Sequence, residues 1–207
     1  MANELTQISE SLRTRMELIH LAREKALANG RKIIQVSSKA IKHLHRRQHE
    51  EADALIAQGE SLVAEALTSV QSHPSIRYAP YLQDSIKEYV EAVALRSIIL
   101  QSQLPTPETL QVEPPTYLNG LCEAASECRR YALDELRQGR PDVARRLAES
   151  MEDIYDELVT FDYPDAVTGN LRRNVDALRA VLERTQSDLS VAGMQLELID
   201  ELRKSRQ

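Results

Sequence analysis

The chain has 207 residues, of which 42% are hydrophobic, and a net charge of −6, so it can bury one sizeable core and is not a uniformly basic nucleic-acid coat. Glycine and proline are scarce and Trp is absent, a composition that favours helices over strands. No apolar run approaches the roughly 20 residues that span a membrane, and the first residues lack a signal-peptide pattern. We therefore expect a cytoplasmic protein without a membrane segment, in which Cys122 and Cys128 are reduced and buried.

The first predicted helix covers about residues 4–44, with a loosening near Gly30, because apolar residues recur along it every three or four positions. At ~1.5 Å per residue it would be ~55–60 Å long, which is too long for a compact monomer and indicates assembly. Residues 25–49 contain no Asp or Glu, so this basic window is a candidate surface for nucleic-acid phosphates. A solvated helix face is the alternative. The cations that we expect to contact nucleic acid in this window are Arg31, Lys32, Lys39 and Arg46.

The rest of the chain predicts further helices and no convincing strand. The breaks are Ser72-His73-Pro74, the proline-rich segment 104–115 and Gly139-Arg140-Pro141. We expect one all-α domain over residues 1–207, built as an antiparallel bundle of about seven helices. The predicted helices after the first cover about residues 50–70, 80–103, 116–137, 141–161, 166–185 and 186–204.

Glu88 and Glu91 lie three residues apart on the predicted helix 80–103, so their side chains are neighbours on its surface. They share a face with an apolar stripe that includes Leu95. Two acids beside apolar surface are costly unless a cation lies between them, and a metal ion is the usual cation. A salt bridge or a solvated helix edge is the alternative.

Two further acids are weighed in the same way. Glu127 lies on a small apolar side of the predicted helix 116–137, where Arg130 is its simplest partner. Asp156 falls on the polar side of the predicted helix 141–161, and by helical spacing alone it is a surface acid. Spacing within single helices therefore does not connect either acid to Glu88 and Glu91.

The segment YLNGLCEAASECRRYALDEL, which begins at residue 117, resembles the translin superfamily. The stretch EYVEA at residues 88–92 and the Tyr-Asp at residues 155–156 are similar to its branch typified by translin-associated factor X. The linker LPTPETLQVEPPTYL resembles that of archaeal-type members, so the resemblance covers essentially the whole chain. The residues that match the pattern after the linker are Tyr117, Leu118, Gly120, Glu123, Glu127 and Arg130.

The resemblance implies a translin-like fold of seven helices and assembly into a hollow homo-octamer that binds single-stranded RNA or DNA inside its shell. It also implies Mg²⁺-dependent endoribonuclease activity, with Mn²⁺ as an alternative ion. By residue matching, the metal ligands are Glu88, Glu91 and Asp156, and Glu127 is a neighbouring catalytic candidate. Carboxylates suit this role because Mg²⁺ prefers hard oxygen ligands and needs few of them.

The residues that contact nucleic acid in translin are only partly present in this sequence. Arg77 matches an arginine of translin's binding stretch, but Ala79 and Tyr81 stand at the positions of two histidines. With Arg130, Arg77 completes the expected RNA contacts. The sequence predicts an endoribonuclease for single-stranded RNA, and two alternatives stay open: a non-catalytic binder of single-stranded RNA or DNA, and a helical scaffold or adaptor.

Overall fold

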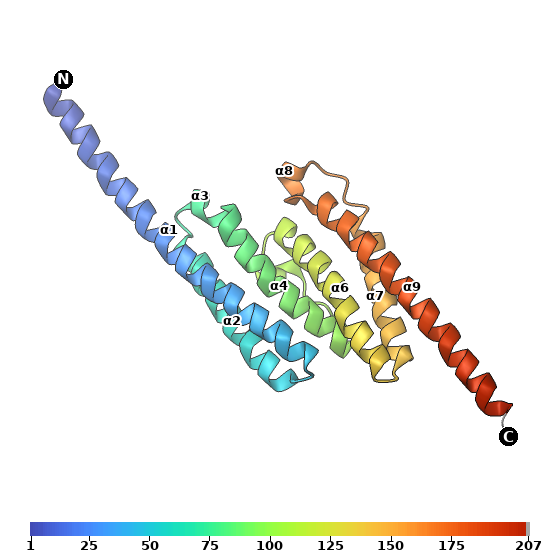
Figure 1. The fold of residues 1–207 in the computed structure, drawn as a ribbon. Coiled ribbons are helices and arrows are strands. Elements are labelled where there is room, and N and C mark those ends of the chain that lie inside the picture. Colours follow the sequence, from blue (N-terminus) through green and yellow to red (C-terminus); the bar gives the residue numbers. More distant parts are fainter. Residues whose placement is uncertain (206–207) are drawn as a thin grey trace.

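The computed structural model describes residues 1–205, and within them the chain forms helices and no strand, which confirms the predicted all-α fold (Figure 1). Three helices of four residues each lie in the connections between the long ones. The long helices are α1 (Ala2–His45), α2 (His49–Ser69), α4 (Pro80–Leu100), α6 (Pro114–Arg137), α7 (Pro141–Leu158) and α9 (Leu171–Lys204). The short ones are α3 (Pro74–Arg77), α5 (Pro107–Leu110) and α8 (Asp165–Thr168).

Proline sets the start of several long helices, including α4 at Pro80, α6 at Pro114 and α7 at Pro141. Proline suits the first helical position because its fixed φ matches the helix and its missing N–H has no partner there anyway. The prediction of two helices over 166–185 and 186–204 is wrong, because α9 runs through Gln186 without interruption. No glycine or proline lies at that point to stop it.

The first helix is also continuous, and the expected loosening near Gly30 does not occur. Gly30 instead lies against α4, where a Cβ atom would come within 2.7 Å of the Ser85 Oγ. The absence of a side chain thus allows α1 to approach α4 closely. With 44 residues, α1 is about 65 Å long, longer than the rest of the bundle requires.

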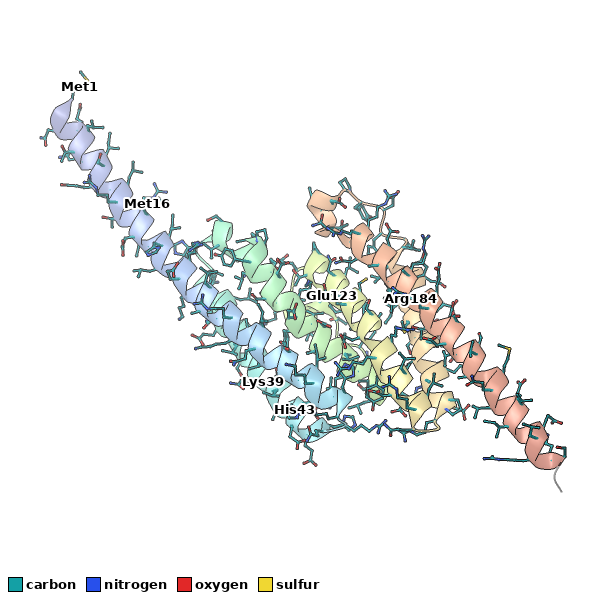
Figure 2. All side chains as sticks on the ribbon, in the orientation of Figure 1. Met1, Met16, Lys39, His43, Glu123 and Arg184 are labelled. Atoms are coloured by element: carbon teal, nitrogen blue, oxygen red, sulfur yellow. The ribbon has the colours of Figure 1, made fainter. Side chains whose placement is uncertain are left out.

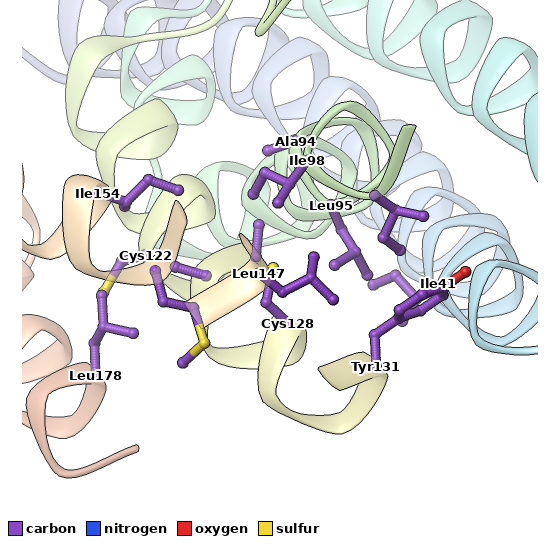
Figure 3. Close-up of a cluster of buried hydrophobic side chains, with 14 of the residues drawn as sticks. Ile41, Ala94, Leu95, Ile98, Cys122, Cys128, Tyr131, Leu147, Ile154 and Leu178 are labelled. Atoms are coloured by element: carbon purple, nitrogen blue, oxygen red, sulfur yellow. The ribbon is translucent and has the colours of Figure 1, made fainter. Parts of the chain in front are cut away.

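The main hydrophobic core joins α4, α6, α7 and α9, with the end of α1 closing one side (Figure 3). Leu95 and Leu147 are fully buried in it, and from Val90 to Ile99 nearly every residue of α4 is buried. This part of α4 is therefore covered on several sides, which its lack of a polar face allows. Cys122 and Cys128 are free, buried thiols of this core. A second cluster packs α1, α2 and α4 around Ile33, Leu82 and Ile86.

The two ends of the chain project from the bundle (Figure 1). The first half of α1 and the last third of α9 extend beyond the body on opposite sides of it, as single helices. Both carry large exposed apolar side chains, such as Leu12 and Met16 on α1 and Met194 and Leu198 on α9. Figure 2 labels Met16 on the free part of α1. No helix in the described part of the chain is long and apolar enough to cross a membrane.

Candidate functional site

Three carboxylates meet where α4 packs against α6. Glu88 and Glu91 of α4 and Glu123 of α6 each offer an oxygen atom, and these atoms lie within 4.8 Å of one another. Figure 2 labels Glu123 on α6, near the middle of the bundle. Glu91 is buried, with 8% of its surface exposed, and the other two are half-buried. We call these three residues the acid cluster.

A glycine brings the two helices close enough to form the cluster. At Gly120 of α6, a Cβ atom would lie 2.7 Å from the Cβ of Val90 and 2.9 Å from the backbone oxygen of Lys87. Only a residue without a side chain allows α6 to approach α4 this closely. Glu123 follows Gly120 by almost one helical turn, so it is presented on the same face, next to Glu88 and Glu91.

The charges of the cluster are not balanced. The pKa of Glu91 is raised to about 8, mainly by burial, and the negative charges of Glu88, Glu123 and Glu127 contribute in the same direction. Burial and the charge of Glu123 also raise the pKa of Glu88. One ammonium group opposes them, because the Lys87 Nζ lies 2.6 Å from the Glu123 Oε1. Three carboxylates beside one ammonium group leave an excess of negative charge, which a further cation would neutralise.

The donor set fits a hard divalent cation. Mg²⁺ is commonly held by one or two protein carboxylates together with water and substrate phosphate oxygens, so Glu88, Glu91 and Glu123 suffice as ligands. A cation here would also remove the cost of keeping Glu91 ionised in a buried position. The pair that the sequence singled out, Glu88 and Glu91, is therefore part of this group.

The other two predicted acids lie outside the cluster. Glu127 accepts a hydrogen bond at 2.7 Å from the Nε2 of His45, whose ring is almost fully buried, and this contact lowers the pKa of Glu127. Asp156 is exposed on α7, because the helix turns Ile154 and Leu158 to the core and Asp156 away from it. Its assignment as a metal ligand stays a prediction from the resemblance.

The third member of the cluster, Glu123, was not among the residues that helical spacing selected. It lies 32 positions after Glu91, and no periodicity within one helix connects residues so far apart. The available signal was Gly120, because a glycine inside a helix often marks a close approach to another helix. Together with the Glu123 that follows it, this glycine points to the crossing with α4.

The predicted contacts of the basic window lie on one stripe of α1 and directly after its end. Arg31, Lys32 and Lys39 fall within about 100° on the helical wheel of α1, Arg46 follows its last residue, and all four are exposed. Among the described side chains, none of the four forms an ion pair with an acid. They are not paired to neighbouring acidic helices, so a phosphate chain can reach them.

The other two predicted RNA contacts already have local partners. Arg77 is half-buried, lies 3.5 Å from the Glu113 carboxylate and stacks over the Tyr78 ring at 5.7 Å from its centroid. Arg130 is exposed on α6, and its charge helps to lower the pKa of Glu127. Arg130 follows Glu127 by about one turn of α6 and Glu123 by about two.

A polar pocket of about 730 Å³ adjoins the acid cluster, and Glu123 of the cluster and its ion-pair partner Lys87 both line it. It lies between the start of α4, the start of α6, α8 and the start of α9. We call it the α4–α8–α9 pocket. The side chains of Thr116, Asn119 and Arg173 are among those that line it.

Comparison with known proteins agrees with this architecture. The model of the Translin family matches residues 7–187. An uncharacterized protein of Methanocaldococcus jannaschii is 29% identical over 185 residues, which are 88% of this chain and 81% of the relative.

Solved structures of C3PO proteins have the same fold. The crystal structure of AfC3PO is 34% identical, with a TM-score of 0.84 over 90% of this chain and 97% of the other. A complex of AfC3PO with duplex RNA is 33% identical, with a TM-score of 0.83 over 90% and 96%. Apo-NeC3PO, at 20% identity, a TM-score of 0.80 and coverage of 88% and 96%, shares the fold.

Proposed function

Since the chain belongs to the Translin family, we propose that it is a Mg²⁺-dependent endoribonuclease that cleaves single-stranded RNA. The observation that carries this proposal is the acid cluster, whose three carboxylates lie within 4.8 Å of one another with one lysine beside them. The structure of AfC3PO with duplex RNA supports RNA as the class of ligand. The acid cluster adds a reason to expect hydrolysis and not binding alone.

The acids of the cluster have distinct tasks in this proposal. Glu88, Glu91 and Glu123 hold the cation, and Glu91 must first release the proton that its raised pKa favours. When bound, Mg²⁺ acidifies a coordinated water and neutralises charge on the phosphate that is attacked. Mn²⁺ has the same preference for carboxylate oxygens and should substitute for it.

Glu127 is suited to accept the proton of the attacking water. It lies outside the acid cluster, yet its charge is felt at Glu91. The hydrogen bond from His45 keeps its pKa low, so it is ionised at neutral pH, and it also fixes the orientation of the carboxylate.

The stripe of Arg31, Lys32, Lys39 and Arg46 is the proposed track for the RNA backbone. Exposed, unpaired cations bind phosphates without regard to sequence, and the affinity falls steeply with salt. Few aromatic side chains are present to read bases, so we expect weak sequence preference. Single-stranded DNA should bind to the same track, because the contacts are to the phosphates.

Self-association completes the proposal. The exposed apolar side chains on the free ends of α1 and α9 form faces that a single chain leaves uncovered. We propose that copies of the chain pack through these faces into a hollow homo-octamer that encloses the RNA. Light scattering should give the mass of eight 23.4-kDa chains, and Leu12→Asp combined with Met16→Asp should reduce it.

The decisive experiment is cleavage of an end-labelled, unstructured RNA by matched carboxamide variants. Glu91→Gln and Glu123→Gln should each reduce Mg²⁺-dependent cleavage about 100-fold or more, because each removes a charged ligand. Glu149→Gln, an exposed acid of α7, is the control and should leave the rate unchanged. RNA binding in EDTA should survive in all three variants. Wild-type rates in the Glu91 variant would overturn the assignment.

Asp156→Asn belongs in the same series, since the resemblance and the geometry give it different roles. A loss equal to that of Glu91→Gln would place Asp156 in the catalytic machinery of the assembled protein. A rate equal to that of Glu149→Gln would leave Glu88, Glu91 and Glu123 as the complete ligand set.

A non-catalytic binder of single-stranded nucleic acid is the second candidate, and the contact between Lys87 and Glu123 favours it. At 2.6 Å, this ion pair already gives one acid of the cluster a cation. Under that function, RNA binds in EDTA and stays intact when Mg²⁺ or Mn²⁺ is added. A chain that does not bind RNA at all would instead be a scaffold.

A further inference from the structure

The α4–α8–α9 pocket has a size and a position that the metal site does not explain. Its volume of about 730 Å³ is within the range of roughly 300–1,000 Å³ that is typical of ligand pockets. It opens beside Glu123, one of the acids that would hold the cation, and Lys87 lines it as well. Whatever occupies the pocket would therefore lie next to the proposed metal site.

The polar side chains of the pocket are fixed in place by bonds between four helices. Asn119 of α6 donates to the backbone oxygen of Thr168 in α8 at 2.7 Å, and Asn174 of α9 donates to the Oδ1 of Asn119 at 2.7 Å. Thr116 of α6 donates to the Oε1 of Gln83 in α4 at 2.5 Å. These bonds hold a rigid polar wall before any ligand arrives, which lowers the cost of binding one.

One side of the pocket is suited to a phosphate. The acids that line the pocket, Asp84, Glu113 and Glu123, belong to α4 and the N-terminal part of α6, whereas Arg173 lines it from α9. Arg173 is exposed, and among residues 1–205 no acid forms an ion pair with it. The long helix α9 begins beside it at Leu171 without a side-chain cap. An arginine next to an uncapped helix N-terminus attracts an anion through both the guanidinium charge and the backbone N–H groups.

An aromatic ring stands at another edge. Tyr78, between α3 and α4, lines the pocket, is 57% exposed and carries the Arg77 guanidinium 5.7 Å from its ring centroid. An exposed ring beside a polar pocket is a platform on which a nucleic-acid base can stack. A phosphate site and a stacking ring in one pocket match the two ends of a nucleotide.

We propose that the α4–α8–α9 pocket holds one nucleotide of the RNA strand, adjacent to the scissile phosphate, with its own phosphate on Arg173 and its base on Tyr78. This inference rests on the proposed cleavage at the acid cluster and adds the subsite that places the strand there. Arg173 and Tyr78 bind and position the strand, and neither exchanges a proton with it.

The first test compares two adjacent arginines. Arg173→Ala should raise the KM for a short single-stranded RNA about tenfold, leave kcat within about twofold, and reduce the slope of log affinity against log salt by about one. Arg172→Ala is the matched control, because Arg172 is also exposed on α9 but does not line the pocket. Equal behaviour of the two variants would overturn the proposal.

A second pair of variants tests the stacking ring. Tyr78→Ala should weaken RNA binding at least about fivefold, whereas Tyr78→Phe should restore it, because stacking needs the ring and not the hydroxyl. Tyr163→Ala removes another exposed ring, one that does not line the pocket, and should leave binding unchanged. Equal affinities of the Phe and Ala variants at position 78 would contradict the stacking role.

Chemical blocking gives a test that does not depend on side-chain energetics. Cys122 and Cys128 are buried, and burial raises the pKa of each thiol to about 12, so a cysteine added at the surface is labelled selectively. Ala166→Cys, at the pocket, should lose RNA binding after reaction with a bulky maleimide. Ala177→Cys, exposed on α9 outside the pocket, should keep it.

The outcomes separate this inference from the proposed function. If the wild type cleaves RNA in Mg²⁺ but Arg173→Ala matches Arg172→Ala, and the blocked Ala166→Cys protein still binds, the pocket is not a nucleotide subsite although the nuclease stands. If the wild type binds RNA through Arg173 and Tyr78 without cleaving it, the subsite stands and the nuclease fails.

Discussion

Two buried glutamates of this bundle differ in what surrounds them. Glu135, near the end of α6, is 2% exposed and accepts bonds from the guanidinium groups of Arg47 and Arg140. Glu91, in the middle of α4, is 8% exposed and lies among other acids. Burial alone would raise the pKa of both, but the two arginines bring the pKa of Glu135 below its ordinary value, while that of Glu91 rises to about 8.

The difference separates a structural acid from a binding site. Glu135 has its cations within the chain, and it ties the end of α1 to the turn between α6 and α7. Glu91 lacks such a partner, so folding leaves a cost that a cation from solution can remove. A buried acid in an excess of negative charge is therefore more informative about function than a buried acid that is fully paired.

Among the substitutions, the largest expected loss of stability comes from replacing the paired acid. Glu135→Gln should lower the free energy of unfolding at pH 7 by about 2–3 kcal/mol, because it leaves two guanidinium groups without their carboxylate. The estimate is below that for a fully buried pair, since both arginines are partly exposed. Urea unfolding followed by circular dichroism measures the change.

The control for this prediction is Glu91→Gln at the same pH, which should not destabilise the metal-free protein. The stabilisation from Glu135 is present above the ordinary pKa of a glutamate and is lost as the pH falls through its lowered, folded-state pKa. The wild type and Glu135→Gln should thus converge in acid. Equal losses from the two substitutions would remove the distinction between the two acids.

The next effect concerns the helix crossing that forms the acid cluster. Gly120→Ala should destabilise the protein by about 2 kcal/mol, because its Cβ would meet the Val90 side chain and the Lys87 backbone. It should also weaken the Mg²⁺-dependent rise in Tm, since Glu123 would move away from Glu91. Gly193→Ala is the control, as a Cβ there meets nothing within 4 Å.

A different kind of effect is the pH dependence of stability that Glu91 causes. Its folded pKa, about 8, is above the ordinary value of 4.5, so the folded state holds the extra proton between these two values. In that window, stability without metal should fall by up to about 1.4 kcal/mol per pH unit as the pH rises. Urea unfolding from pH 5 to pH 9 measures this slope.

Two changes should remove that slope. Glu91→Gln has no proton to lose, so its stability should vary less with pH than that of the wild type. Saturating Mg²⁺ should stabilise the wild type most at the alkaline end, where Glu91 is ionised and free to bind it. A wild-type curve that is the same with EDTA and with Mg²⁺ would contradict cation binding at the acid cluster.

The sequence predicted the helices well where proline and glycine mark their ends. The start of α4 at Pro80 and the break around Gly139-Arg140-Pro141 were read correctly because these residues restrict the backbone directly. The division of α9 at Gln186 failed, since no such residue stands there. Local backbone chemistry was thus sufficient for most of the fold.

Only part of the candidate site could be predicted from the sequence in this way. Glu88 and Glu91 are neighbours on one helix, so spacing alone paired them. Glu123 joins them through the close packing of α6 on α4, and His45 reaches Glu127 across 82 positions. Contacts between helices depend on which small side chains let the backbones approach, and helical periodicity does not contain that information.

The smallest expected change in stability tests the one cation that the acid cluster already has. Lys87→Met should change the free energy of unfolding without metal by less than about 1 kcal/mol, because the Lys87–Glu123 pair is partly exposed. Its effect on Mg²⁺ should be larger. Removing a positive charge beside the ligands should raise the apparent Mg²⁺ affinity about tenfold in a Tm titration, equivalent to about 1.4 kcal/mol.

This last variant also decides between the two candidate functions. If Lys87 competes with a divalent cation for Glu123, its loss strengthens Mg²⁺ binding, and Lys39→Met, which removes an exposed lysine of α1, does not. If Lys87 is the permanent partner of Glu123, as a non-catalytic binder requires, both variants respond to Mg²⁺ as weakly as the wild type. The acid cluster would then have a structural role like that of Glu135, but with one cationic side chain as its partner instead of two.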